Sequence, residues 1–222
     1  MDAVIILLII LMCMLSIIVM DYMFQKLGLK IMFIIMYILS LIMSLKQITL
    51  GNISFNLNII PYVSLISIVY IFIKKYNIKD NIKDLKIICL YTLFIYLSLF
   101  LFINYKASIS DIISFSLNTF ISNNYISLLL FPVITMISIY GTHKLYNIIK
   151  NTDNILFVIV AISSIIVGLI DSVFYGTISA ITTMSIDLSL KLGLGNYLFR
   201  ILLSLLFIPM INYVVKRKKE SV

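Results

Sequence analysis

The chain has 222 residues, of which 62% are hydrophobic and only 12% are charged, and its formal net charge is +8. Because a water-soluble domain is roughly half apolar and about a quarter charged, this composition excludes a soluble globular protein and predicts an integral membrane protein. The basic residues lie in short stretches between apolar runs, without interleaved aromatic residues, so we expect a lipid bilayer and no nucleic acid as partner.

Seven apolar segments follow one another along the chain, and each approaches the ~20 residues that a helix needs to cross the hydrocarbon core. Backbone groups in lipid must be satisfied within one element, so we expect helices here. We therefore predict an all-α integral membrane protein, a compact bundle of six or seven transmembrane helices that forms a single domain over residues 1–222. The segments run roughly over 3–20, 29–45, 56–73, 86–104, 125–146, 155–177 and 196–215.

Lysine and arginine are distributed unevenly between the connections of these segments. If the carboxyl-terminal KRKKESV is cytoplasmic, 13 of the 17 basic residues lie on the cytoplasmic side. The positive-inside rule describes this asymmetry and predicts an outer amino terminus and an inner carboxyl terminus. The heavy use of Ile, Lys and Asn is typical of an AT-rich bacterial genome. We expect a multi-pass protein of the bacterial cytoplasmic membrane.

Polar residues gather where the second segment gives way to the third. Lys46 and Gln47 are expected to end the second helix. Asn56 is expected to cap the third helix, because an asparagine side chain accepts a hydrogen bond from the free N–H groups of a first turn. Asn58 is left open between a cap and a ligand-binding amide, since an amide both donates and accepts.

Two connections on the predicted outer side are amphipathic. Residues 107–123 and 178–194 carry apolar residues at helical spacing with polar residues between them. They are expected to be interfacial helices or re-entrant segments, or else ordinary amphipathic loops that lie on the bilayer.

Asp171 lies in one of the most apolar stretches, VGLIDSVFYG. A charge at the centre of a membrane helix costs about 2.5–3.5 kcal/mol on insertion scales, so an acid there is a candidate functional residue. Ser164, Gly168, Tyr175 and Ser179 share its helical face, which indicates a packed interface or a cavity wall. The alternative is a protonated carboxyl that only holds helices together.

The stretch 155–182 is too long for a straight membrane crossing. As a helix it measures about 42 Å, whereas the hydrocarbon core is about 30 Å thick. The helix must therefore tilt, or break near Gly168 or Gly176. A broken helix marks the binding site in many transporters.

Arg200 is the other charge predicted inside the membrane, in GNYLFRILLSLLFIP. Its long side chain can snorkel to the interface, or it can pair with Asp171 or with a substrate. No hydrolytic triad, metal-ligand spacing or nucleotide-binding loop is present in the sequence. We therefore expect no enzyme, no catalytic residue, no metal and no cofactor.

Four stretches of the sequence resemble the queuosine precursor transporter family, which is also called the vitamin uptake transporter family. The Asp-Ser-x-x-Phe motif corresponds to Asp171, Ser172 and Phe174, and a basic residue nine before a proline corresponds to Arg200 and Pro209. The acidic stretch that follows the family's second core helix is absent, and the chain resembles a divergent member. The matching stretches are SLKQITLGN, SSIIVGLIDSVFY, LFRILLSLLFIP and INYVVKRKK.

The resemblance implies a six-helix transporter core over residues 29–219, with residues 1–28 as an additional amino-terminal helix. It implies import of a small planar heterocycle, a deazaguanine precursor of queuosine. Two alternatives stay open. One is a substrate-binding membrane subunit of an energy-coupling vitamin importer, and the other is a non-transport membrane accessory protein. A homodimer or an energising partner is compatible with each. The expected substrate-binding residues are Asp171, Arg200, Lys46, Gln47, Asn58, Ser172 and Tyr175.

Overall fold

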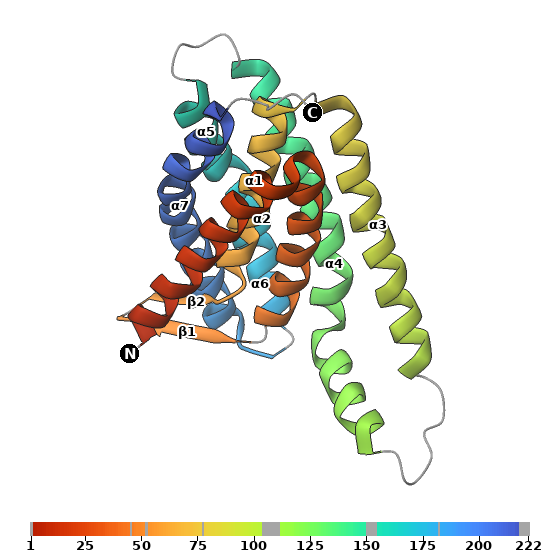
Figure 1. Ribbon diagram of the computed structural model, residues 1–222. Coiled ribbons are helices and arrows are strands. Elements are labelled where there is room, and N and C mark those ends of the chain that lie inside the picture. The colour runs from red at the N-terminus through yellow and green to blue at the C-terminus, as the bar shows by residue number, and fades with distance from the viewer. Residues whose placement is uncertain are drawn as a thin grey trace.

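The computed structural model describes residues 2–44, 46–51, 53–76, 78–103, 112–149, 155–181 and 183–217. The protein is a helical bundle (Figure 1). Its elements are α1 (Asp2–Met43), β1 (Gln47–Leu50), β2 (Ile53–Asn56), α2 (Ile59–Lys75), α3 (Ile78–Ile103), α4 (Ile112–Ile149), α5 (Ile155–Gly168), the π-helix η1 (Leu169–Phe174), α6 (Tyr175–Ala180) and α7 (Ile186–Lys216).

Within the described residues, four helical stretches are long and apolar enough to cross a membrane. This finding supports the predicted class of a helical membrane protein. The four stretches are Ala3–Met43, Tyr125–Ile149, Phe157–Ala180 and Ile186–Lys216.

The helix α1 is folded into two antiparallel arms. Gln25 interrupts it with φ 48° and ψ −126°, and Figure 1 shows the chain turning back at the end of the first arm. The two arms touch closely at Gly28, where an added Cβ would lie 2.1 Å from the carbonyl oxygen of Met20. Figure 1 also shows that the start of α1 and the end of α7 lie at opposite ends of the bundle.

The first arm of α1 buries one narrow stripe. Its buried residues follow one another at intervals of three and four, as expected for one helix face. Large apolar side chains on the remaining surface, such as Leu8 and Met12, are exposed. A helix that is apolar on all sides but packed on only one suits a lipid environment. The buried stripe consists of Ile6, Ile10, Cys13, Ile17 and Asp21.

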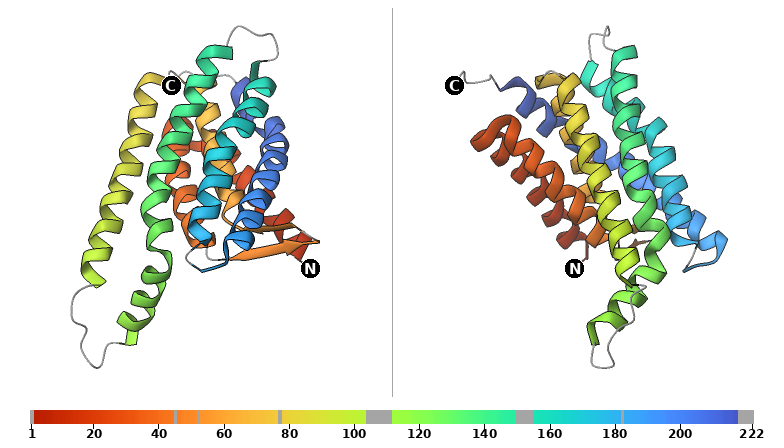
Figure 2. Two further views of the ribbon diagram at one scale, coloured as in Figure 1. Left: turned by 180° about the vertical axis from the view of Figure 1, so that it is seen from behind. Right: turned by 90° about the vertical axis from the view of Figure 1, so that its right-hand side faces the viewer.

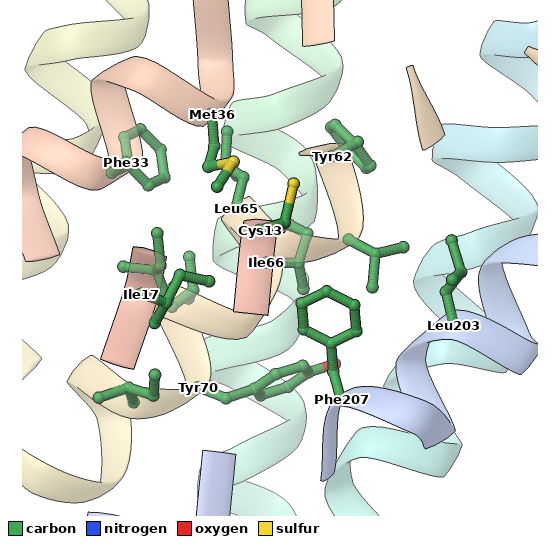
Figure 3. Packing of buried hydrophobic residues seen from close by; sticks show 14 of the residues in the cluster. Cys13, Ile17, Phe33, Met36, Tyr62, Leu65, Ile66, Tyr70, Leu203 and Phe207 are labelled. Atoms are coloured by element: carbon green, nitrogen blue, oxygen red, sulfur yellow. The ribbon is translucent and has the colours of Figure 1, made fainter. Parts of the chain in front are cut away.

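The core forms around α2, whose residues Ile59–Ile73 are all buried. Side chains from both arms of α1 and from α7 pack against α2, so α2 is the central helix of the bundle. Figure 3 shows this packing at close range, with side chains from α1, α2 and α7 in one cluster. The labelled side chains include Ile17, Phe33, Met36, Leu65, Ile66, Leu203 and Phe207.

A short antiparallel hairpin, β1–β2, stands beside the predicted helices and was not expected from the sequence. Ile48 pairs with Phe55 and Leu50 pairs with Ile53, and Gly51 in the turn has φ +60°, which favours glycine. The expectation that Lys46 and Gln47 end a helix is wrong, because α1 ends at Met43.

The prediction that Asn56 caps the third helix is also wrong. Asn56 ends β2, and its backbone N–H donates to Asn196 Oδ1 on α7 at 2.7 Å. Asn58 occupies the position before α2, but its side chain makes no capping hydrogen bond. Neither amide side chain therefore caps α2.

The two amphipathic connections are not separate elements. Residues 112–123 form the first turns of α4, which continues unbroken to Ile149 and extends past the rest of the bundle beside α3 (Figure 2). Residues 107–111 lie outside the described residues. The second connection, 178–194, is divided between the end of α6, a turn and the first turns of α7.

The hairpin rests directly on α7 at Gly195. A Cβ added to Gly195 would lie 1.9 Å from the carbonyl oxygen of Ser54. Because backbone must move to admit it, we expect Gly195→Ala to lower the free energy of unfolding by about 1–3 kcal/mol, as overpacking does. Thermal melting followed by circular dichroism in detergent measures this change.

Gly141→Ala is the matched control for this substitution. The nearest contact of its added Cβ is a side-chain methyl group of Val167, at 3.1 Å, rather than a backbone atom. Alanine also favours a helix over glycine by about 1 kcal/mol. We expect an unchanged or raised melting temperature for Gly141→Ala, and equal losses in the two variants would contradict the close contact between the hairpin and α7.

Candidate functional site

The helix that carries Asp171 widens where the residue lies. After Gly168 the α-helical turn of α5 gives way to the π-helix η1, which holds Asp171, and α6 resumes the α-helical turn at Tyr175. The sequence predicted a tilt or a break near Gly168 or Gly176, and the helical geometry does change after Gly168. Short π-helical turns within α-helices occur frequently at functional sites.

Asp171 forms a buried ion pair with Arg200 of α7. Arg200 Nη2 lies 2.8 Å from Asp171 Oδ2, and the two side chains are 1% and 0% exposed. The second guanidinium nitrogen, Nη1, donates to the carbonyl oxygen of Ser164 at 3.1 Å. The pairing suggested by the sequence is confirmed, and snorkelling of Arg200 to the interface is wrong.

Three hydroxyl groups complete the surroundings of the carboxylate. Ser138 of α4 donates to Asp171 Oδ2 at 2.9 Å, and the Tyr62 hydroxyl of α2 lies 3.2 Å from the same oxygen. Ser172 donates to Oδ1 at 3.0 Å. We call these five residues the Asp171 cluster. It joins α2, α4, η1 and α7, and it provides the hydrogen bonds that a buried charge requires.

Gly168 has no side chain, and this leaves room for the guanidinium of Arg200 between the helices. A Cβ on Gly168 would lie 2.5 Å from Arg200 Nη1 and 3.0 Å from the ring of Tyr197. Ser164 is also fully buried on this side. The part of the predicted face that holds Ser164 and Gly168 therefore packs against α7 of the same chain.

A small cavity, which we call the inner pocket, lies beside the Asp171 cluster. Its volume is about 10 Å³, which is enough for roughly one water molecule. In the present conformation Asp171 is closed off from any larger molecule. The inner pocket is lined by Asn58, Ile59, Tyr62, Phe131, Ile134, Asp171, Tyr175 and Asn196.

A larger cavity, the vestibule, lies next to it at the hairpin end of the bundle. Its volume is about 180 Å³. Asn58 and Tyr175 line both cavities, so these two side chains stand between the vestibule and the inner pocket. The other lining residues of the vestibule are Ser44, Gln47, Asn56, Ser127, Ser179, Ala180, Thr183 and Leu192.

The predicted site residues fall into three groups. Asp171, Arg200 and Ser172 belong to the Asp171 cluster, whereas Asn58, Tyr175 and Gln47 line the vestibule. Lys46 lies apart from both. It is exposed and lines a separate cavity with Ile5 and Leu57.

Sequence reasoning missed four residues that help build the site. Tyr62 and Ser138 hold the carboxylate, and Asn196 and Asn56 connect α7 to the hairpin. The available signal was the presence of polar groups inside strongly apolar helices, as in PYVSLIS and TMISIYGT. Such groups need partners in lipid, but the sequence does not say which ones.

Within the described part of the chain, no group of three or more His, Cys, Asp or Glu residues is placed to hold a metal ion. Comparison of the sequence with protein-family models and with curated proteins, and of the structure with solved structures, gives no match. The functional argument therefore rests on the residues of the site.

Proposed function

We propose that the protein is a multi-pass transporter of the bacterial cytoplasmic membrane that imports a small planar heterocycle, a deazaguanine precursor of queuosine. The observation that carries the proposal is the position of the Asp171 cluster, a buried ion pair beside the inner pocket, which shares the lining residues Asn58 and Tyr175 with a polar cavity. Ionisable residues inside membrane helices mark substrate pathways. Apolar packing alone has no need of such an arrangement.

The proposed topology has seven crossings, with the two arms of α1 counted separately. The amino terminus and the hairpin lie outside and the carboxyl terminus lies inside, as the distribution of basic residues predicts. The vestibule then faces the outside. A solute would enter it first and would reach the Asp171 cluster only after Asn58 and Tyr175 move apart.

At the Asp171 cluster, a ring N–H group would replace the hydroxyl of Tyr62, which lines the inner pocket, as a donor to the carboxylate, while Ser138 keeps its hydrogen bond to Oδ2. The ion pair with Arg200 would stay in place and hold the carboxylate in its orientation. The inner pocket must widen for this step, because its volume of about 10 Å³ excludes a ring. In the described conformation the Asp171 cluster is closed to such a solute.

Uptake of a labelled cyano-substituted deazaguanine tests the proposal, in a bacterial strain that neither makes nor imports this base. We expect accumulation above the empty-vector strain. Ser138→Ala removes a donor to Asp171 while the ion pair stays, and a lost hydrogen bond to a charged group is worth about 1.5–3 kcal/mol. We therefore expect uptake to fall by about tenfold or more at an unchanged protein level in the membrane.

Ser98→Ala is the matched control, because Ser98 is exposed on α3 and, among the described residues, donates to Phe94 of its own helix. We expect wild-type uptake for this variant. Accumulation no higher than in the empty-vector strain would refute the transport proposal. Wild-type uptake by Ser138→Ala would show that the solute does not pass the Asp171 cluster.

A second candidate function follows from the closed state of the cluster. Every oxygen of the carboxylate already has a protein partner, as expected if the ion pair only fixes the arrangement of α2, α4 and α7. The protein would then be a membrane accessory factor without transport. The same uptake experiment separates the two functions.

A further inference from the structure

The vestibule is polar but carries no charge. Every residue that the described part of the chain contributes to its lining carries a hydroxyl group, an amide group or an apolar side chain. Transfer of an ion into such a place without a counter-charge is costly, whereas a neutral polar molecule needs only hydrogen-bond partners. The lining therefore favours an uncharged solute.

The hydroxyl groups of the vestibule already donate within the protein. Ser44 donates to the carbonyl oxygen of Leu41 at 2.6 Å, and Thr183 donates to that of Ala180 at 3.1 Å. Ser127 and the Tyr175 hydroxyl bond each other at 2.8 Å. The amide side chains of the vestibule are thus the groups best placed to recognise a solute.

Asn56 is distinct among these amides. It is only 6% exposed, and its side-chain Oδ1 has no hydrogen-bond partner among the described residues. Its backbone is fixed, because β2 pairs with β1 and its N–H donates to Asn196. A buried polar atom without a partner costs about 1–3 kcal/mol, and a ligand that supplies the missing hydrogen bond recovers that cost.

We propose that the vestibule is itself a binding site for an uncharged, hydrogen-bonding molecule, and that the Asn56 amide determines its specificity. At about 180 Å³ the vestibule is smaller than the ~300 Å³ of pockets for drug-sized ligands, so the occupant is a small molecule. The inference rests on the proposed function in one respect, which is the choice of the ring system used as the probe. It adds a first binding site, separate from the Asp171 cluster, at which charged relatives of the solute are rejected.

Isothermal titration calorimetry of the full chain in detergent tests this inference with two probes of one ring system. One probe is the cyano-substituted deazaguanine, which is neutral, and the other is its carboxylate analogue, which is an anion of similar shape. We expect saturable binding of the cyano compound and binding of the carboxylate that is weaker by about tenfold or more. Equal affinity for the two probes, or no saturable binding of either, overturns the inference.

Asn56→Ala is expected to weaken binding of the cyano compound by about two- to tenfold, the effect of one hydrogen bond. The variant should fold, because the lost side-chain Oδ1 has no partner among the described residues and the backbone bond to Asn196 remains. Asn147→Ala is the matched control, since Asn147 is exposed and bonds only His143 in the described structure. Unchanged binding by Asn56→Ala overturns the inference.

Ser138→Ala distinguishes a failure of this inference from a failure of the proposed function. It should lower uptake yet leave binding in the vestibule unchanged, because Ser138 lines neither cavity. Binding that depends on Asn56 without any uptake supports the vestibule site and refutes transport. If uptake falls in Ser138→Ala but binding is unchanged in Asn56→Ala, the vestibule site is refuted and the proposed transport stands.

Discussion

Replacement of Asp171 by asparagine is expected to lower the free energy of unfolding by about 3–5 kcal/mol, because it leaves the guanidinium of Arg200 buried without a counter-charge. Arg200 is 1% exposed, and its Nε already lacks a partner among the described residues. The loss is measured as a lower midpoint in thermal melts of the detergent-solubilised protein. Asp187→Asn, which breaks an exposed ion pair with Lys191, should change the midpoint little.

A double variant separates the effect on stability from an effect on transport. When Asp171→Asn is combined with Arg200→Gln, both charges disappear, and we expect most of the lost stability to return. If the proposed transport is correct, uptake by both the single and the double variant should be absent, because no carboxylate is left to accept a hydrogen bond from the solute. A double variant as unstable as Asp171→Asn would show that the hydroxyls of Tyr62 and Ser138, and not the charge of Arg200, determine stability at this site.

Replacement of Asp21 by asparagine is the second change with a large expected effect. Asp21 Oδ2 lies 2.6 Å from Lys75 Nζ, with side chains 1% and 6% exposed, and Tyr76 donates to Asp21 Oδ1 at 3.1 Å. This ion pair joins the first arm of α1 to the end of α2. We expect a loss of about 3–5 kcal/mol, concentrated in the contact between that arm and α2.

Cysteine labelling locates the effect of Asp21→Asn. Cys13 is buried on the first arm, so its reaction with a membrane-permeant maleimide should speed up when the arm loosens, while Cys89, buried on α3, keeps its rate. Asp84→Asn is the matched control, because the ion pair between Asp84 and Lys30 joins the second arm of α1 to α3 but is partly exposed. An unchanged rate at Cys13 would contradict the role of this ion pair.

The sequence predicted those features that depend on composition and local length. Apolar runs indicated membrane-spanning helices, and the excessive length of 155–182 indicated an irregularity near Gly168, where η1 begins. The pairing of Asp171 with Arg200 was one of three alternatives, beside snorkelling and pairing with a substrate, because the sequence does not show whether two opposite charges in apolar surroundings lie close together.

The hairpin was missed because its residues are as apolar as those of the helices beside it. The stretch ITLGNISF contains β-branched residues on both sides of a Gly-Asn pair, which is a hairpin signal that a count of hydrophobic residues ignores. Tyr62 and Ser138 were missed for a different reason. They lie 109 and 33 residues from Asp171 along the chain, and only the packing of α2 and α4 brings them to it.

The short distance between Asp171 and Arg200 also determines how the membrane potential acts on this ion pair. A charge that crosses the membrane field gains about 2.3 kcal/mol per 100 mV, but two opposite charges that move together gain nothing. Because the pair is held at 2.8 Å, any rearrangement that carries it as one unit is insensitive to voltage. For the proposed import, an electrical driving force would have to act on other charges, and a concentration gradient or metabolic trapping of the solute would suffice without one.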